Sequence, residues 1–206
     1  MTRGAPRTLL AVSLALASGW PLALWLGQRA GALDVVLASY ATLLLVVLWL
    51  AGREVLRPLL VFRPKPALVG AALGAALVVS AHLAYPHVAR ALPFVAEGVH
   101  QVYAGLSGSE ALFSLALVAL AEEMLFRGVL IDALSARMRA PWAWALAIGL
   151  YALAQVGAGI ALLPLLAFGF GGVFALERRL SQSLVAPVAT HLVWTLALAV
   201  AFPITP

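Results

Sequence analysis

The sequence contains no cysteine, which excludes a disulfide framework, a thiol nucleophile and a cysteine-ligated metal site. It is also poor in charge: only 10% of its 206 residues are charged, against about 25% in soluble domains. Hydrophobic residues make up 64% of the chain, and the mean hydropathy is +1.05. These values exclude a soluble globular domain and indicate a membrane protein with several spans of about 20 residues each.

The apolar runs predict an all-α bundle of about seven spans in a single transmembrane domain, residues 1–206. The expected spans are 9–26, 35–51, 67–85, 110–134, 142–156, 160–176 and 184–202. Residues 15–17 read Ala-Leu-Ala, similar to a signal-peptidase site, and cleavage there would leave six spans. We favour an uncleaved first span because the apolar run continues to Trp25. Residues 86–109 form the longest polar connection, for which we expect an interfacial helix.

Basic residues gather in alternate connections, which predicts the orientation of the bundle. With seven spans, the basic groups that fall on one side are Arg3/Arg7, the 53–65 loop, Arg137/Arg139 and Arg178/Arg179. We therefore expect a cytoplasmic N-terminus and an outer C-terminus. This bias also explains the net charge of +5, so we expect the lipid bilayer, and no nucleic acid, as a partner. The composition, with almost no lysine, is typical of GC-rich bacterial genomes and favours a bacterial inner (plasma) membrane.

Two adjacent carboxylates, Glu122 and Glu123, interrupt an apolar run that begins at Ala111. Each ionisable group inside a span costs about 2.5–3.5 kcal/mol on insertion scales, and such groups are functional candidates by default. Glu123 and Arg127 are four residues apart and share a helix face, which we interpret as a structural ion pair. Glu122 has no such partner on its own helix. We therefore expect it to meet polar groups of another span.

Gln155 and His191 are the predicted polar neighbours of Glu122, because all three lie at a similar depth. Glu122 precedes Arg137 by 15 residues, Gln155 follows Arg139 by 16, and His191 follows Arg179 by 12. At 1.5 Å per residue these depths agree within about one turn. Thr195 is four residues from His191 and can face the same layer. For each of these side chains a hydrogen bond that only bridges two helices stays open as an alternative, and it is the preferred interpretation for His82.

The chemistry of such a layer is that of an acid–base site. A glutamate in a low-dielectric site can act as a general base, and a nearby amide or imidazole can position water or stabilise an oxyanion. No serine has the setting of a nucleophile. One histidine, two carboxylates and an amide are a thin ligand set for zinc. We therefore expect no cofactor and activity that survives chelators, with zinc left as the open alternative.

Three motifs on successive spans resemble those of the CPBP intramembrane proteases, the CAAX-protease and bacteriocin-processing (Abi/Rce1-like) superfamily. The family pattern is EExxxR, then FxxxH, then HxxxN or HxxxD. Here the motifs are EExxxR at Glu122–Arg127, YxxxQ at Tyr151–Gln155 and HxxxT at His191–Thr195. The resemblance marks residues 110–202 as the catalytic core. It implies an endopeptidase that hydrolyses a peptide bond near the C-terminus or membrane-proximal part of a membrane-associated protein.

The resemblance also implies roles for individual residues. Glu122 and the second motif would activate water, and the third motif would form an oxyanion hole or, in another account, bind a metal. The predicted catalytic residues are Glu122, Glu123, Gln155, His191 and Thr195, with Arg127 as the structural ion-pair partner. The implied substrates are CAAX-like tails, leader peptides and C-terminal sorting tags.

Gln155 departs from the family pattern, because an amide cannot act as a base and is a poor zinc ligand. It can still orient water beside Glu122, and Thr195 can donate a hydrogen bond in place of asparagine. Two hypotheses stay open, an active protease of the glutamic type and an impaired pseudoprotease that binds or escorts protein tails. A transporter subunit is a third and weaker one, because the sequence shows no paired inverted repeat with interrupted helices. The sequence does not determine the oligomeric state.

Overall fold

The computed structural model describes residues 5–104 and 110–204, and every regular element in these ranges is helical. The α-helices are α1 (Ala5–Ala30), α2 (Leu33–Leu59), α3 (Pro64–Ala91), α4 (Pro93–Ala104), α5 (Glu110–Glu122), α6 (Ile131–Ser135), α7 (Ala140–Ala154), α8 (Leu162–Ser181) and α9 (Val185–Leu196). Three further segments are the π-helical η1 (Glu123–Leu130) and η3 (Ala197–Ala201) and the 3₁₀-helical η2 (Gln155–Ala158). Because η1 joins α5 to α6, and η2 and η3 extend α7 and α9, the described chain forms seven long rods and the short α4. The predicted all-α membrane bundle is confirmed.

The surface and the lengths of the helices are those of a multi-pass integral membrane protein. Four helical stretches are long and apolar enough to cross a membrane, namely Thr8–Ala30, Leu33–Leu59, Pro64–Ala91 and Ala140–Ala158. Large apolar side chains also face outward, among them Leu50 at 74% and Leu180 at 76% exposure. In water such a surface would be an aggregation hazard, whereas lipid tails solvate it.

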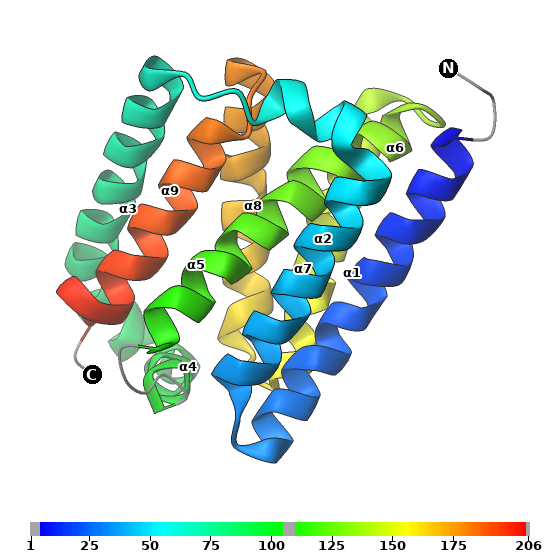
Figure 1. Ribbon diagram of the computed structural model, residues 1–206. Coiled ribbons are helices and arrows are strands. Elements are labelled where there is room, and N and C mark those ends of the chain that lie inside the picture. The colour runs from blue at the N-terminus through cyan, green and yellow to red at the C-terminus, as the bar shows by residue number, and fades with distance from the viewer. Residues whose placement is uncertain (1–4, 105–109, 205–206) are drawn as a thin grey trace.

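The helix α5 and its continuation η1 occupy the middle of the bundle. In Figure 1, α5 crosses the view between the α1–α2 pair on one side and the α3–α9 pair on the other, with α7 and α8 behind. Every residue from Ala121 to Ile131 is buried. The segment that carries both glutamates is therefore the one most completely surrounded by other helices.

The two ends of the bundle differ in which connections they hold. In Figure 1 the N-terminal end of α1 and the α2–α3, α6–α7 and α8–α9 connections lie at one end, and α4 and the C-terminus lie at the other. Arg7, the 53–65 segment, Arg137/Arg139 and Arg178/Arg179, which the sequence predicted to share a side, fall at the first of these ends, and Arg3 lies outside the described residues. The helix ends therefore have the alternation that seven spans require.

The two largest errors in the predicted boundaries are at the ends of α2 and α3. The helix α2 continues beyond residue 51 through Arg53 to Leu59, and α3 continues through Pro86 to Ala91 instead of ending before it. Leu56 and Leu59 are buried, so packing favours a longer α2 although Pro58 removes one hydrogen bond from its last turn. The helix expected within 86–109 is present as α4.

Candidate active site

Glu122 ends α5 with a side chain that is held at both carboxylate oxygens. The Tyr151 hydroxyl donates a hydrogen bond to Oε2 at 2.9 Å, and the Gln155 amide Nε2 donates one to Oε1 at 2.8 Å. Tyr151 and Gln155 are four residues apart on α7–η2, so both reach the same neighbour. The predicted contact between Gln155 and Glu122 is therefore present. The partners that Glu122 lacks on its own helix come from the next span.

His191 on α9 stands between the two glutamates. Its Nδ1 lies 3.0 Å from Glu123 Oε1, and its Nε2 lies 3.8 Å from Glu122 Oε2. The Phe174 ring of α8 stacks on the imidazole with the ring centres 4.9 Å apart, which fixes the plane of the ring. Glu123 thus orients the imidazole so that Nε2 faces Glu122. The predicted convergence of three spans in one layer is what the geometry shows.

Glu123 and Arg127 form the ion pair expected from their spacing. Arg127 NH1 lies 3.2 Å from Glu123 Oε1, and the two side chains are 2% and 0% exposed. Among the described residues, neither Nη1 nor Nη2 of the guanidinium has an aligned hydrogen-bond acceptor, so the contact is electrostatic rather than a directed hydrogen bond. The guanidinium also lies over the Tyr151 ring, with Cζ 4.0 Å from the ring centre. Arg127 therefore neutralises Glu123 and packs against the Tyr151 ring, which holds that ring in place.

The π-helical η1 carries Glu123 and Arg127 directly after Glu122. Such segments are rare in proteins and are frequent at functional sites, because they widen the helix and change the direction of its side chains. The spacing rules applied to the sequence assume 3.6 residues per turn and did not predict this segment. It directs two adjacent glutamates at one imidazole.

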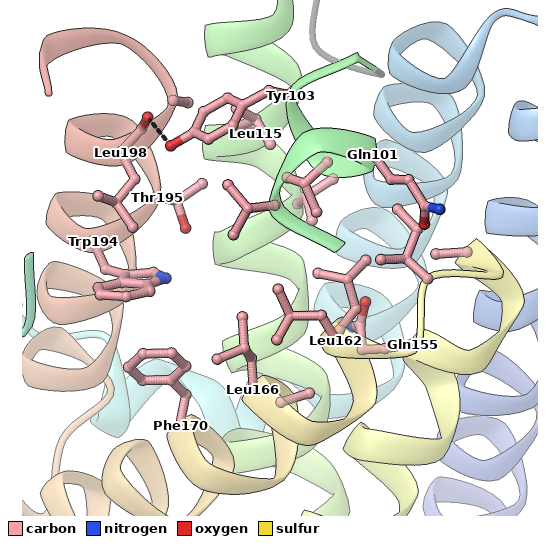
Figure 2. Close-up of a pocket in the computed structure, with 18 of the residues that line it drawn as sticks. Gln101, Tyr103, Leu115, Gln155, Leu162, Leu166, Phe170, Trp194, Thr195 and Leu198 are labelled. Carbon is pink, nitrogen blue, oxygen red and sulfur yellow. Dashed lines mark hydrogen bonds between the residues drawn. The ribbon is translucent and has the colours of Figure 1, made fainter. Parts of the chain in front are cut away.

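A cavity of about 460 Å³ begins at this layer and is lined by Glu122, Tyr151, Gln155 and His191. Figure 2 shows that its remaining walls are mostly aliphatic and aromatic, with Thr195, Trp194 and Phe170 on one side and Leu166 and Leu162 below. Its size suits an organic ligand or a peptide segment. A few polar groups at the end of an apolar cavity are the usual plan of a binding or catalytic site.

The site residues do not suit a metal ion. Among residues 5–104 and 110–204 no group of three or more His, Cys, Asp or Glu side chains is arranged to hold one. Both oxygens of Glu122 already accept hydrogen bonds, and Glu123 Oε1 is shared between Arg127 and His191. Three of the four carboxylate oxygens therefore contact protein groups, and only Glu123 Oε2 has no hydrogen-bond partner among the described residues, which leaves a metal ion few free ligand atoms.

Two further predicted residues lie as follows. Thr195 lies one helical turn after His191 and lines the cavity (Figure 2). His82 does not bridge two helices through Nδ1, because this atom contacts the Val78 carbonyl of its own helix at 2.9 Å. The interpretation of His82 as a bridging residue is wrong for that nitrogen, because its partner is the carbonyl one turn earlier on the same helix.

Sequence reasoning missed three polar groups around this layer. The Tyr151 hydroxyl was read only as part of a motif, although its spacing of four from Gln155 could have indicated a shared partner. Glu177 and Thr190 are joined by a buried 2.7 Å hydrogen bond between α8 and α9. Thr190 also contacts the Gly70 carbonyl of α3 at 2.9 Å. The position of Thr190 directly before His191 was the available signal.

Comparison with known proteins identifies a family match for part of the chain. Residues 104–197 match the family described as type II CAAX prenyl endopeptidase Rce1-like. No curated protein and no solved structure matches the chain. The matched range runs from the end of α4 into η3 and contains the whole site, whereas α1, α2 and α3 lie outside it.

Proposed function

Because residues 104–197 match the Rce1-like family, a family of CAAX-type membrane proteases, we propose that the chain is an intramembrane endopeptidase of the glutamic type. One observation carries this proposal. The carboxylate of Glu122 is buried at the end of a cavity and held at both oxygens by the neutral donors Tyr151 and Gln155. A carboxylate so oriented is suited to accept a proton from water.

The proposed reaction is the hydrolysis of one peptide bond. Glu122 accepts a proton from a water molecule while the water oxygen bonds to the scissile carbonyl carbon. The carbonyl oxygen becomes an oxyanion, for which the His191 Nε2–H and the Thr195 hydroxyl are the available donors. When the carbon–nitrogen bond breaks, Glu122 returns the proton to the leaving amine. The products are a carboxylic acid and an amine, and no oxidant or reductant is needed.

Charge balance supports the role of His191. Glu122 and Glu123 are two buried negative charges, and Arg127 supplies one positive charge. In this proposal His191 carries a proton on both nitrogens and so adds a second positive charge beside the two glutamates. An imidazolium held by Glu123 presents its second N–H toward Glu122 and the cavity, where the oxyanion forms.

The substrate in this proposal is a membrane-associated protein or peptide. The apolar cavity would hold the residues on either side of a bond near the C-terminus or next to a membrane span, as in a CAAX-like tail, a leader or a C-terminal sorting tag. Lateral contact with lipid would bring such a substrate to the bundle.

The test compares purified wild-type protein with Glu122→Gln on a panel of membrane-associated peptides in liposomes. We expect the substitution to lower the rate at least about 100-fold, because the amide cannot accept the proton from water. Glu54→Gln is the matched control, since Glu54 is exposed on α2 and far in sequence from the motifs. Equal cleavage by wild-type protein and Glu122→Gln would remove Glu122 as the base.

One observation favours a second candidate. Gln155 fills the place of the family's histidine and makes a direct hydrogen bond with Glu122, as an amide that only stabilises a buried acid would do. A pseudoprotease that binds protein tails in the cavity would show this arrangement without hydrolysis. Wild-type protein that is inactive on the whole panel, yet binds a panel peptide in a Glu122-independent manner, would establish this second function.

A further inference from the structure

We propose that the site opens toward the non-cytoplasmic end of the bundle, so that the polypeptide it acts on is an apolar segment presented at the outer face of the membrane. The accessibility of the cavity is a property of the fold, and only the nature of its occupant rests on the function proposed above. Three independent features carry this inference: the residues that line the cavity, the packing beneath the site, and the distribution of charge.

The cavity extends from the polar layer in one direction only. On α5 it is lined by Leu115 and Val118, which precede Glu122 and so lie nearer α4. On α9 and η3 it is lined by Thr195 and Leu198, which follow His191 and lie nearer the C-terminus. Apart from Phe174, which stacks on His191 in the polar layer, the lining residues of α8, such as Leu162 and Leu166, belong to its first half, at the same end (Figure 2). All of these walls therefore belong to the α4 half of the bundle.

The opposite half is filled with side chains. Directly beyond Glu122 along η1, Leu125, Phe126 and Leu130 are 0%, 1% and 0% exposed. Leu56 of α2 and Leu184, which precedes α9, are 0% exposed in the same cluster. A polypeptide could reach Glu122 from that end only by displacing a close-packed core.

Charge places the filled half at the cytoplasm. Of the thirteen Arg and Lys residues, ten lie at or near the end that holds the N-terminus, counting Arg3 by its place in the chain, and Arg127 is buried at the site. The other end has only Arg29 and Arg90. Because cytoplasmic connections of membrane proteins carry the excess of basic residues, the α4 end is the outer one.

The helix α4 forms the outer rim of the cavity. Its Val95, Val99 and Tyr103 line the wall, and the Tyr103 hydroxyl donates a 2.8 Å hydrogen bond to the Leu198 carbonyl (Figure 2). A Cβ on Gly98 would lie 2.6 Å from Leu162 Cβ, so α4 rests closely on α8. An occupant thus passes α4 on its way to Glu122 and meets mainly aliphatic walls, which select an apolar segment.

Single cysteines test the direction of access, and the cysteine-free chain gives no background. Leu166→Cys and Leu198→Cys place a thiol in the cavity on two different helices, Lys65→Cys marks the basic end, and Leu130→Cys marks the packed half. Each full-length variant is labelled with a charged, membrane-impermeant methanethiosulfonate in right-side-out and in inverted membrane vesicles. The fraction of labelled thiol over time is measured by a mass shift.

We expect the two cavity thiols to react at least 10-fold faster in right-side-out vesicles, Lys65→Cys to react faster in inverted vesicles, and Leu130→Cys to react in neither. Faster labelling of the cavity thiols in inverted vesicles, or no labelling of them from either side, would overturn the proposal. Labelling involves no hydrolysis, so outer access together with an inactive peptide panel would refute the protease and leave the inference intact. Cleavage together with cytoplasmic access would overturn the inference about access and leave the protease proposal intact.

Discussion

Gln155 and Tyr151 give Glu122 a pair of donors that does not depend on pH in the physiological range. An amide does not titrate, and a tyrosine hydroxyl keeps its proton far above neutral pH. A histidine at position 155 could exchange protons with Glu122, whereas Gln155 can only hold it at 2.8 Å. In the proposed mechanism Glu122 is therefore both the acceptor of the water proton and its later donor.

Substitution of Gln155 tests this division of work. We expect Gln155→His to keep or raise the cleavage rate, because the imidazole can both orient water and share its proton. We expect Gln155→Leu to lower the rate about 10–100-fold, since a hydrogen bond to a charged group contributes about 1.5–3 kcal/mol. Initial rates on the best peptide of the panel measure the effect, and a melting curve of each variant checks folding. A Gln155→Leu protein that is folded and fully active would show that the amide has no role in catalysis.

Tyr151→Phe is the corresponding test of the other donor. The ring would stay beneath Arg127, and only the hydroxyl that donates to Glu122 Oε2 at 2.9 Å would be lost. We expect kcat to fall about 10-fold or more with KM little changed, because a buried carboxylate oxygen loses its partner and its orientation. A rise in KM with unchanged kcat would instead place the hydroxyl in substrate binding.

At the scale of elements, the contact between α3 and α9 holds one wall of the site. Gly70 and Gly74 of α3 are buried against the α9 backbone, as expected for a spacing that lets two helices approach closely. A Cβ on Gly70 would collide with the Ala186 carbonyl, and one on Gly74 would lie 2.8 Å from the Thr190 carbonyl. This closeness also allows Thr190 to contact the Gly70 carbonyl, which fixes the helix turn that carries His191.

Gly70→Ala should therefore lower both stability and activity. The two helices must separate to admit the methyl group, and overpacking of this kind costs about 1–3 kcal/mol. Gly149→Ala is the matched control, because at that position of α7 a Cβ would have no atom of another described helix within 4 Å. Melting temperature in detergent is measured by tryptophan fluorescence. A Gly70→Ala protein as stable as Gly149→Ala would show that the α3–α9 contact is looser than the structure has it.

At the scale of the whole molecule, an odd number of rods places the two chain ends at opposite ends of the bundle, as Figure 1 shows. The basic connections then face one side, and the cavity opens toward the other. The orientation of the protein in the membrane therefore determines the side from which a substrate reaches the cavity.

Reporter fusions test the orientation of the chain in the membrane. We expect a reporter inserted after Arg63 to be cytoplasmic and one fused after Pro206 to be outside, because the basic residues of the 53–65 segment favour the cytoplasm. Two reporters are fused at each site in turn, an enzyme that is active only outside and a fluorescent protein that is fluorescent only inside. At a given site only one of the two should give a signal. Both fusions on one side would mean that one of the seven rods does not cross the membrane.

The sequence by itself determined the features that depend on local composition and on depth. Apolar runs of the right length specify spans, and the cost of burying Glu122 without a partner requires polar company from another helix. Their equal depth then identified Gln155 and His191 as these polar partners, and both lie beside Glu122 in the structure. These inferences hold because rise per residue and transfer cost are nearly the same in every transmembrane helix.

Only the tertiary structure decided how the helices are rotated and how closely they approach. The π-helical turn that directs Glu123 at His191, the hydroxyl of Tyr151 on Glu122, and the bond between Glu177 and Thr190 all depend on it. So does the one-sided cavity, because a core is filled or open according to which side chains meet across several helices. Helix rotation and separation are set by contacts between residues far apart in the chain, and a pattern read along one helix contains no record of them.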